Sequence, residues 1–262
     1  MSVIPLHLDR PAPWWRRVGE FHDQPGCPAW IRDGLRDFLA GLDLGRTVLV
    51  EELSGLLRRH DLHRIIDRCA GTGGVWRGLL PDLRRTVPGA EVVLTDLHPP
   101  AAGLVPRLDG LVADPHPCDA LGDDRDPPGV RTWIRCFHHF TPAQQRRVLA
   151  TAVATRQPLL LVETTVLTPR NLLLNLGCLL GQPLAALHRA WRAPLAALGS
   201  TALPVLPLVA TWDALASVLR TGRPDELLAQ AETQARPDWR WSLRIGRSAL
   251  GADLMVLTGE PC

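Results

Sequence analysis

The hydrophobic positions along the chain fall into two patterns that predict different elements. Apolar residues recur at helical spacing through residues 28–44 and again through 50–60, so we expect the first sixty residues to be largely helical. Short apolar runs of strand character follow, at residues 62–67, 91–96, 110–114, 131–136 and 159–164. Helical stretches at 76–87 and 141–153 separate some of these runs. Strands that alternate with helices, several of them apolar throughout, are typical of a parallel sheet covered on both faces.

The pattern changes after residue 165. Residues 166–235 are rich in Leu, Ala and Pro and mostly helical, and two strands at 239–246 and 253–259 predict a closing hairpin. The fold class is therefore α/β, with a Rossmann-like, doubly wound, mostly parallel sheet. We interpret residues 1–262 as a single domain with four parts: an N-terminal helical cap (1–60), the core (61–165), a helical insertion after the fifth strand (166–235) and the closing β-hairpin (236–262).

Composition narrows the class of protein. Apolar residues make up 46% of the chain and charged residues 21%, which is typical of a folded soluble protein. The formal net charge is only +2, so we expect no nucleic-acid partner, because phosphate binding usually brings a clear basic surplus. The chain contains no Lys and no Tyr, which excludes Schiff-base chemistry and a lysine or tyrosine base.

Cysteine spacing and apolar runs bear on metals and location. The six cysteines include no Cys-x-x-Cys pair and no Cys/His spacing that fits zinc, so we expect reduced thiols, no metal and a cytoplasmic protein. The N-terminus lacks the apolar run of a signal peptide. The least charged stretch, residues 194–212, is interrupted by prolines, so we expect no membrane span.

The sharpest local feature is a glycine-rich turn between the first strand of the core and the helix that follows it. Asp67, Cys69, Gly71 and Gly73 stand there at alternate positions. Glycines let a ligand approach the backbone closely, and the helix N-terminus offers free N–H groups. Asp96 ends the next strand, where α/β nucleotide-binding proteins place a carboxylate for ribose hydroxyls.

A third acidic position, Asp119, follows the third strand and precedes Ala120. All of these residues would face one crevice, because the carboxyl ends of parallel strands meet at one edge of a sheet. Each has another interpretation. The glycines would also suit a structural turn or a nicotinamide dinucleotide site, although the last glycine of that fingerprint is missing. Asp96 would serve equally as a helix cap or turn residue, and Asp119 as a solvated loop carboxylate.

The glycine turn resembles the first motif of class I S-adenosylmethionine-dependent methyltransferases, an acidic residue followed by Gly-x-Gly-x-Gly. Cys69 stands here in place of the first glycine. The likeness extends over nearly the whole chain, through segments such as 20–23, 131–133 and 212–220, to a little-characterised bacterial branch of these enzymes. It implies a seven-stranded sheet with one antiparallel strand, and S-adenosyl-L-methionine as the cofactor.

The resemblance also implies roles for individual residues. Asp67 would anchor the methionine amino end, Asp96 would hold the ribose, and Asp119 would bind the adenine amine. Gly71 and Gly73 would give the cofactor access. The full set that we expect at the cofactor is Asp67, Cys69, Gly71, Gly73, Asp96, Leu97, Asp119, Ala120 and Phe137. For Cys69, a buried small side chain without chemistry is the preferred interpretation over a reactive thiol.

Candidate catalytic residues follow the fourth and fifth strands. His139 is the first candidate for a general base, and His138 the second, since a histidine accepts a proton near neutral pH without much tuning. Glu163 ends the fifth strand, where it would bind substrate or act as a base. The alternatives are that the histidines satisfy backbone groups and pack against the cofactor, and that Glu163 pairs with an arginine.

Candidate substrate-binding residues lie in the cap and the insertion. They are His22, Trp30, Asp213 and Arg220. Asp213 and Arg220 would either face the substrate or pair with each other near the surface. The Leu, Ala and Pro content of residues 166–215 predicts a dry wall over a substrate with apolar area, with plain helix packing or a homodimer interface as alternatives.

The expected function is methyl transfer from S-adenosylmethionine to an O, N or C nucleophile of a small, partly apolar molecule, in specialised metabolism. Two alternatives stay open. A methyltransferase-fold enzyme can use the same cofactor for a non-methyl reaction such as cyclisation, and a methyltransferase-like fold can serve as a non-catalytic binding subunit. The expected partner is a small molecule, and a homodimer is left open.

Overall fold

The computed structural model describes residues 18–24, 26–28, 30–31, 35, 45–100, 102–122, 127–176, 205–248 and 251–262. The chain divides into two compact units. Of the described residues, those from 45 to 164 and from 223 to 262 belong to the sheet unit, and those from 18 to 35 and from 165 to 222 belong to the helical unit. In the part of the chain that the structure describes, no helix combines the length and the apolar character needed to cross a bilayer.

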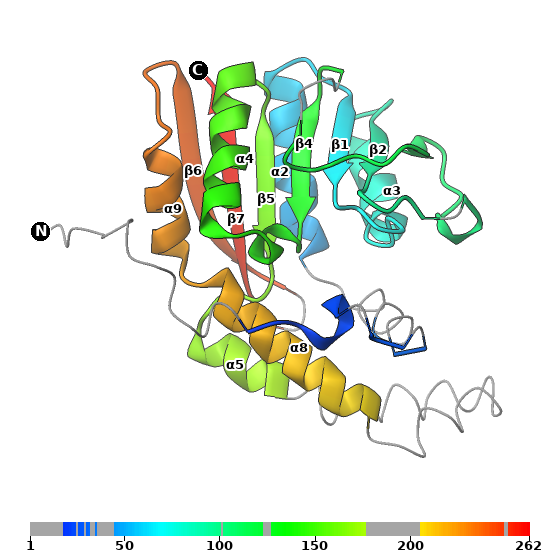
Figure 1. Ribbon diagram of the computed structural model, residues 1–262. Coiled ribbons are helices and arrows are strands. Elements are labelled where there is room, and N and C mark those ends of the chain that lie inside the picture. Colours follow the sequence, from blue (N-terminus) through cyan, green and yellow to red (C-terminus); the bar gives the residue numbers. More distant parts are fainter. Residues whose placement is uncertain are drawn as a thin grey trace, which may run out of the picture. The chain divides into compact units, whose positions relative to one another are not determined.

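The sheet unit is built on seven strands in the order β3-β2-β1-β4-β5-β7-β6 (Figure 1). Their bounds are β1 Arg64–Arg68, β2 Glu91–Thr95, β3 Leu111–Ala113, β4 Val130–Ile134, β5 Leu159–Glu163, β6 Trp239–Arg247 and β7 Asp253–Pro261. Strands β1 to β5 pair in parallel, while β7 runs antiparallel to both β5 and β6. The expected doubly wound sheet with a single antiparallel strand and a closing hairpin is confirmed.

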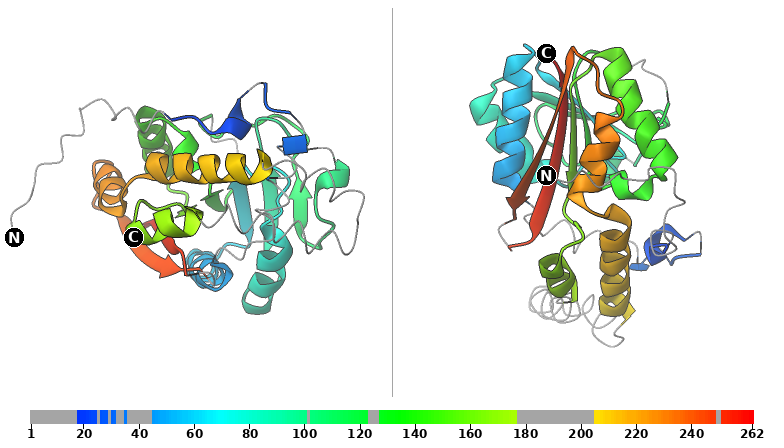
Figure 2. Two further views of the ribbon diagram at one scale, coloured as in Figure 1. Left: turned by 90° about the horizontal axis from the view of Figure 1, so that it is seen from below. Right: turned by 90° about the vertical axis from the view of Figure 1, so that its left-hand side faces the viewer.

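Two helices cover each face of this sheet (Figure 2). On one face lie α2 (Arg46–Arg59) and α3 (Trp76–Thr86), and on the other lie α4 (Pro142–Thr155) and α9 (Pro224–Glu232). The sequence sets these helices up in ordinary ways. Leu49, Leu53, Leu56 and Leu57 form one buried stripe of α2, and Thr141 begins α4 with a capping box and a proline in its first turn.

The hydrophobic core of the sheet unit lies between α2, α3 and the strands. Trp76, Leu80 and Leu83 of α3 are almost completely buried against Ile65 and Val92 of the sheet. Burial of this kind contributes about 25 cal/mol per Å² of apolar surface, so the core fixes α3 and the loop before it. The glycine-rich turn is therefore held on a rigid frame.

The edge of the sheet where the parallel strands end carries the loops that follow β1, β2, β3 and β4. A short 3-10 helix, η3 (Ala102–Leu104), lies between β2 and β3. A second short 3-10 helix, η4 (Phe137–His139), follows β4. In α/β folds this edge is where ligands bind.

The boundaries of the expected cap and insertion differ from those of the units. Helices α2 and α9 belong to the sheet unit, although the sequence placed α2 in the cap and α9 in the insertion. The reason is that their apolar residues pack on the sheet. Much of the expected cap and of the apolar roof, residues 177–204 included, lies outside the described residues.

The helical unit contains α5 (Pro169–Leu176), α8 (Val205–Thr221) and the 3-10 helix η2 (Phe21–Asp23). A small apolar cluster joins the N-terminal segment to α8, through Cys27, Ile31, Leu35 and Ala210. The mostly helical character expected for residues 166–235 is confirmed for the part that the structure describes.

Candidate functional site

Two glycines of the turn after β1 have different surroundings. Both have positive φ, 53° at Gly71 and 69° at Gly73, a backbone conformation that favours glycine. A Cβ atom on Gly73 would lie 2.4 Å from Cδ1 of Leu94, so this glycine allows the turn to pack against β2. A Cβ atom on Gly71 would meet nothing within 4 Å. Among the residues that the structure describes, Gly71 therefore borders open space on the outer side of the turn.

The carboxylate of Asp96 lies beside this open glycine. Its Oδ2 accepts a hydrogen bond from the Gly71 N–H at 2.9 Å, and its Oδ1 accepts one from the His98 N–H at 2.9 Å. The backbone carbonyl of Asp96 accepts from the Cys118 N–H, also at 2.9 Å. Asp96 thus joins the loops that follow β1, β2 and β3. The next residue, Leu97, is 53% exposed.

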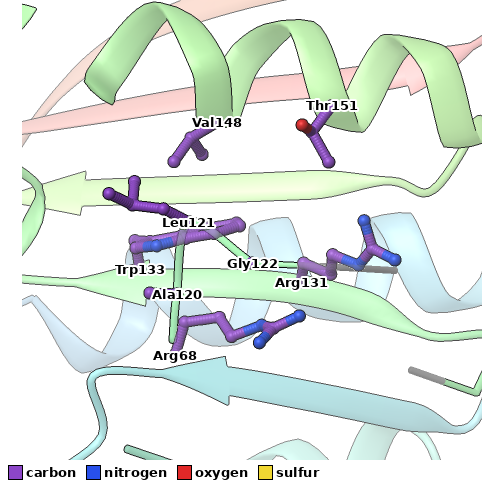
Figure 3. A pocket seen from close by; sticks show the side chains of 8 residues that line it. All are labelled: Arg68, Ala120, Leu121, Gly122, Arg131, Trp133, Val148 and Thr151. Atoms are coloured by element: carbon purple, nitrogen blue, oxygen red, sulfur yellow. The ribbon is translucent and has the colours of Figure 1, made fainter. Parts of the chain in front are cut away.

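Asp119 and Ala120 lie in the loop that Cys118 attaches to Asp96. Oδ1 of the exposed Asp119 accepts from the Leu121 N–H at 2.9 Å and so caps its own turn. Ala120 lines a small pocket (Figure 3), together with Arg68, Leu121, Gly122, Arg131, Trp133, Val148 and Thr151. Arg68 and Trp133 project from the face of the sheet opposite to Asp67 and Thr132, since successive strand residues alternate in direction. This pocket is therefore distinct from the space beside Gly71.

Asp67 is buried beneath the turn. Its Oδ2 accepts from Nε1 of Trp76 and its Oδ1 accepts from Oγ1 of Thr132, both at 2.7 Å. Burial raises the pKa of Asp67 to about 6, although the two hydrogen bonds partly oppose the shift. The sequence pointed to Asp67 but to neither of these partners. The signal at Trp76 was an aromatic residue with a donor in the first turn of α3, and Thr132 was a polar residue inside an apolar strand.

Two other residues expected at the cofactor, Cys69 and Phe137, are less exposed than Leu97. Cys69 is half-buried and has a φ of 54° in the turn, a conformation that a non-glycine residue adopts at a cost. Phe137 is 2% exposed and packs edge-on against Phe140, with ring centroids 6.0 Å apart. Its ring forms part of the packing under η4 and offers little surface to a ligand in this conformation.

The catalytic candidates form one cluster around η4. Glu163 at the end of β5 accepts from the backbone N–H of His138 through Oε1 at 3.0 Å, and its Oε2 lies 2.8 Å from Nδ1 of His138. Both side chains are almost completely buried. The partner of Glu163 in this pair is therefore a histidine, whereas the alternative weighed on sequence grounds was an arginine. The more exposed His139 ring lies next to that of His138, with centroids 4.3 Å apart.

The helical unit brings together three of the four residues expected at the substrate. Nδ1 of His22 lies 2.7 Å from Oδ2 of Asp213, which also accepts from the His22 N–H at 3.3 Å. Arg220 lies 3.3 Å from Oδ2 of Asp23 and 3.5 Å from Oε1 of Glu20. Asp213 is 6% exposed, so it is not the surface residue that the alternative assumed. Trp30 is 50% exposed.

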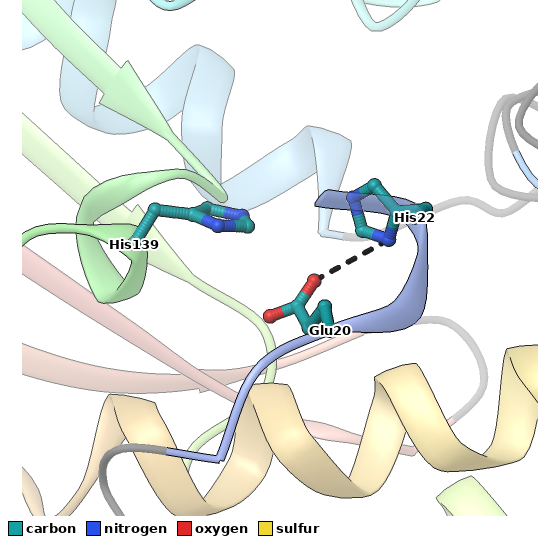
Figure 4. A group of neighbouring side chains, drawn as sticks. All are labelled: Glu20, His22 and His139. Carbon is teal, nitrogen blue, oxygen red and sulfur yellow. Dashed lines mark ion pairs between the residues drawn. The ribbon is translucent and has the colours of Figure 1, made fainter. Parts of the chain in front are cut away.

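Glu20 is a member of this cluster that the sequence reasoning left out of the candidate set. It is 2% exposed, accepts from Oγ of Ser217 at 2.9 Å, and forms an ion pair with His22 at 3.6 Å (Figure 4). Burial alone would lower the pKa of His22, but the hydrogen bond to Asp213 and the negative charges of Glu20 and Asp23 outweigh it, so this pKa lies above its usual value. An acidic residue just before the Phe-His-Asp run was the available signal.

Comparisons with known proteins bear on the fold. No family model matches the chain, and a comparison with curated proteins finds no match. The plantazolicin methyltransferase BpumL, solved with SAH and a pentazolic desmethylPZN analog, is similar over 95% of this chain and 96% of its own, at 11% identity and a TM-score of 0.59.

Two larger enzymes are similar in the same way. Human N-acetylserotonin methyltransferase in complex with SAM gives a TM-score of 0.51 at 12% identity, and the mitomycin 7-O-methyltransferase MmcR gives 0.50 at 15%. Each match covers 93% of this chain, which spans 62% and 61% of the length of those two proteins. At these identities the likeness shows a shared fold.

Proposed function

We propose that this chain, which has the fold of the class I S-adenosylmethionine-dependent methyltransferases, binds that cofactor and transfers its methyl group to a small, partly apolar molecule. The observation that carries the proposal is the open side of Gly71 next to the Asp96 carboxylate. A ligand with vicinal hydroxyls and a flat base fits such a place, because it needs close approach to the backbone and a fixed acceptor.

Different residues would bind different parts of the cofactor. The two backbone N–H groups that bind the Asp96 carboxylate fix its orientation and leave further lone pairs on both oxygens for ribose hydroxyls. The exposed Leu97 offers an apolar surface for the adenine, with Asp119 and Ala120 in the adjoining loop. Asp67 would act on the methionine amino end mainly through its negative charge, because both of its oxygens already accept hydrogen bonds.

When bound, S-adenosylmethionine supplies an electrophilic methyl group on a sulfonium. The chain itself must then orient the acceptor, exclude water and take up a proton where the acceptor carries one. We assign proton acceptance to His139. Glu163 and His138 would act as positioning residues, since their mutual hydrogen bonds fix η4 and with it the backbone of His139.

The acceptor class rests on analogy and on the helical unit. The compared enzymes are named for N-acetylserotonin, mitomycin and plantazolicin. By analogy, we infer that the methyl acceptor of this chain is a small molecule with an O, N or C nucleophile. The polar cluster of His22, Asp213 and Arg220 and the exposed ring of Trp30 are our candidates for contacts with it.

Calorimetric titration with S-adenosylhomocysteine tests the cofactor assignment. We expect Asp96→Ala to weaken binding about 10- to 100-fold, the loss that follows when two hydrogen bonds to a charged acceptor are removed. Asp109→Asn is the matched control, because the Asp109 side chain is 93% exposed and its carboxylate pairs with Arg84 at the surface. Equal binding by wild type and Asp96→Ala, or no binding by wild type at high micromolar ligand, would rule out the assignment.

A further inference from the structure

Two thiols lie at the ends of neighbouring strands, next to the glycine-rich turn. Cys69 follows β1 directly and Cys136 stands two residues beyond β4. These strands pair in parallel with Arg68 opposite Trp133, so both cysteines emerge at the same edge of the sheet. Sγ of Cys136 lies 3.7 Å from the carbonyl oxygen of Arg68, the residue joined to Cys69 by a peptide bond. This places the Cys136 sulfur within side-chain reach of Cys69.

The backbone next to each thiol has a residue in the left-handed region. Cys69 has a φ of 54°, and Arg135, the residue before Cys136, has a φ of 61°. Such angles are unfavourable for residues other than glycine. A glycine would occupy position 69 without strain, so the thiol there is kept against a local preference of the backbone.

The two sulfurs also interact. The hydrogen bond with Cys69 is the largest cause, ahead of burial, that raises the pKa of the Cys136 thiol well above its usual value. Cys136 is buried, whereas Cys69 is half-buried. An oxidant from solvent therefore reaches Cys69 first, and Cys136 is the protected partner that can resolve the product.

We propose that Cys69 and Cys136 are a redox pair that forms a disulfide on exposure to a hydroperoxide. The Cys69 thiolate attacks one oxygen of the peroxide, the O–O bond breaks, and Cys69 becomes a sulfenic acid as the first water leaves. The sulfur of Cys136 then attacks the Cys69 sulfur, the S–O bond breaks, and a second water leaves. The two thiols give up two electrons and two protons, and hydrogen peroxide is reduced to two waters.

The effect that we expect this disulfide to have on cofactor binding rests on the proposed function. Cys69 lies two residues before Gly71, whose N–H binds Asp96, and Cys136 begins η4, which carries His138 and His139. A disulfide would tie the turn to η4 and fix the spacing between them. We expect the oxidised protein to bind S-adenosylhomocysteine about tenfold more weakly, within the usual range of coupling between two sites.

Peptide mapping tests the bond independently of the cofactor. Trypsin cleaves after Arg68 and Arg135, so each thiol begins a peptide of its own, residues 69–77 and 136–146. After treatment with hydrogen peroxide and alkylation of remaining thiols, we expect these two peptides to be joined. The disulfide-linked peptide pair should be absent in Cys69→Gly, which also removes the backbone strain, and in Cys136→Ala. It should persist in Cys262→Ser, because Cys262 is exposed at the chain end.

Other outcomes separate this proposal from the proposed function. Alkylated or over-oxidised Cys69 with no joined peptide overturns the redox pair, even if S-adenosylhomocysteine binds the reduced protein. A joined peptide in a protein that never binds S-adenosylhomocysteine confirms the pair and refutes the proposed function. A joined peptide with equal binding by the reduced and oxidised forms confirms the bond and overturns its coupling to the cofactor. Coupling also requires that bound S-adenosylhomocysteine make the disulfide easier to reduce by the same factor.

Discussion

The two units of the molecule contain the same small arrangement in different surroundings. In each, a 3-10 turn begins with Phe-His and a carboxylate binds the histidine twice, through the backbone N–H and through Nδ1. Glu163 holds His138 of η4 in the sheet unit, at 3.0 and 2.8 Å, and Asp213 holds His22 of η2 in the helical unit, at 3.3 and 2.7 Å. The side chains of the first pair are 5% and 2% exposed, and those of the second 31% and 8%.

The difference in exposure separates two uses of one arrangement. A buried pair cannot exchange partners with water, so its hydrogen bonds hold η4 in place. The second pair is open on one side and surrounded by the charges of Glu20, Asp23 and Arg220, so it can gain or lose a proton. Variants that remove each carboxylate should therefore have unequal effects.

The largest effect is expected from Glu163→Ala. It leaves the backbone N–H and the ring of His138 without an acceptor in a buried place, so we expect the free energy of unfolding to fall by about 4 kcal/mol. Urea denaturation measures this change. Glu232→Ala, at an exposed position of α9, should change it by less than about 0.5 kcal/mol. A loss below about 1 kcal/mol for Glu163→Ala would show that the buried pair does not hold η4.

The second largest effect is expected at Asp67, a buried carboxylate whose partners do not include a histidine. The pKa of Asp67 rises from 3.8 to about 6 on folding, so its contribution to stability is fully present below pH 4 and is lost as the pH rises toward 6. The shift corresponds to roughly 3 kcal/mol. Asp67→Asn removes this loss, and the Thr132 hydroxyl can rotate to accept from the new amide. We expect denaturation curves to show a fall between pH 4 and 7 in wild type and in Asp109→Asn that Asp67→Asn lacks. If stability had the same pH dependence in wild type and in Asp67→Asn, burial would not raise the pKa of Asp67.

Removal of the carboxylate in the helical unit should have a smaller and local effect. Asp213 accepts from the backbone N–H groups of Phe21 and His22, so Asp213→Ala should free η2 from α8 at a cost of about 2 kcal/mol. Amide hydrogen exchange is the suitable measurement. Faster exchange is expected in residues 20–24, with exchange in β1 and β4 unchanged. Unchanged exchange at Phe21 would mean that Asp213 does not hold this segment.

The smallest effect concerns the proton on His22. Its folded pKa is raised, so the charged form stabilises the helical unit fully below about pH 6.5, and this contribution is lost as the pH rises through the folded value. We expect the protection of residues 20–24, corrected for the intrinsic rise of amide exchange with pH, to fall as the pH rises through the folded pKa in wild type and to stay constant in His22→Gln. His116→Gln, at an exposed histidine, should keep the wild-type profile. A wild-type profile in His22→Gln would assign the dependence to another group.

Much of the fold could be predicted from the sequence, because strand and helix periodicity depends on local burial. The seven strands and helices α3 and α4 were expected close to where they occur. The unit boundaries could not be predicted, since the affiliation of α2 and α9 depends on which apolar surface each helix meets. Periodicity shows that a helix has a buried face but does not identify what covers it.

The sequence indicated which candidate residues stand at the ends of strands, but it did not indicate their hydrogen-bond partners. Asp96 was expected at the glycine turn, and it binds the Gly71 N–H. The histidine held by Glu163 and the tryptophan held by Asp67 were not anticipated, because a hydrogen bond between residues on separate elements depends on rotamers and packing. The same limit applied to Glu20, whose partners Ser217 and Arg220 lie on α8, far away along the chain.

Photolabelling with methyl-labelled S-adenosylmethionine tests the central claim most directly. Ultraviolet irradiation of the complex followed by trypsin should place the label in residues 69–77, 86–107 or 108–125, the peptides that carry Gly71, Asp96 and Asp119. Excess S-adenosylhomocysteine should suppress the label, and Asp96→Ala should reduce it about tenfold while Asp109→Asn does not. Label confined to other peptides, or label that is equal in wild type and Asp96→Ala, would contradict a cofactor site at this edge of the sheet.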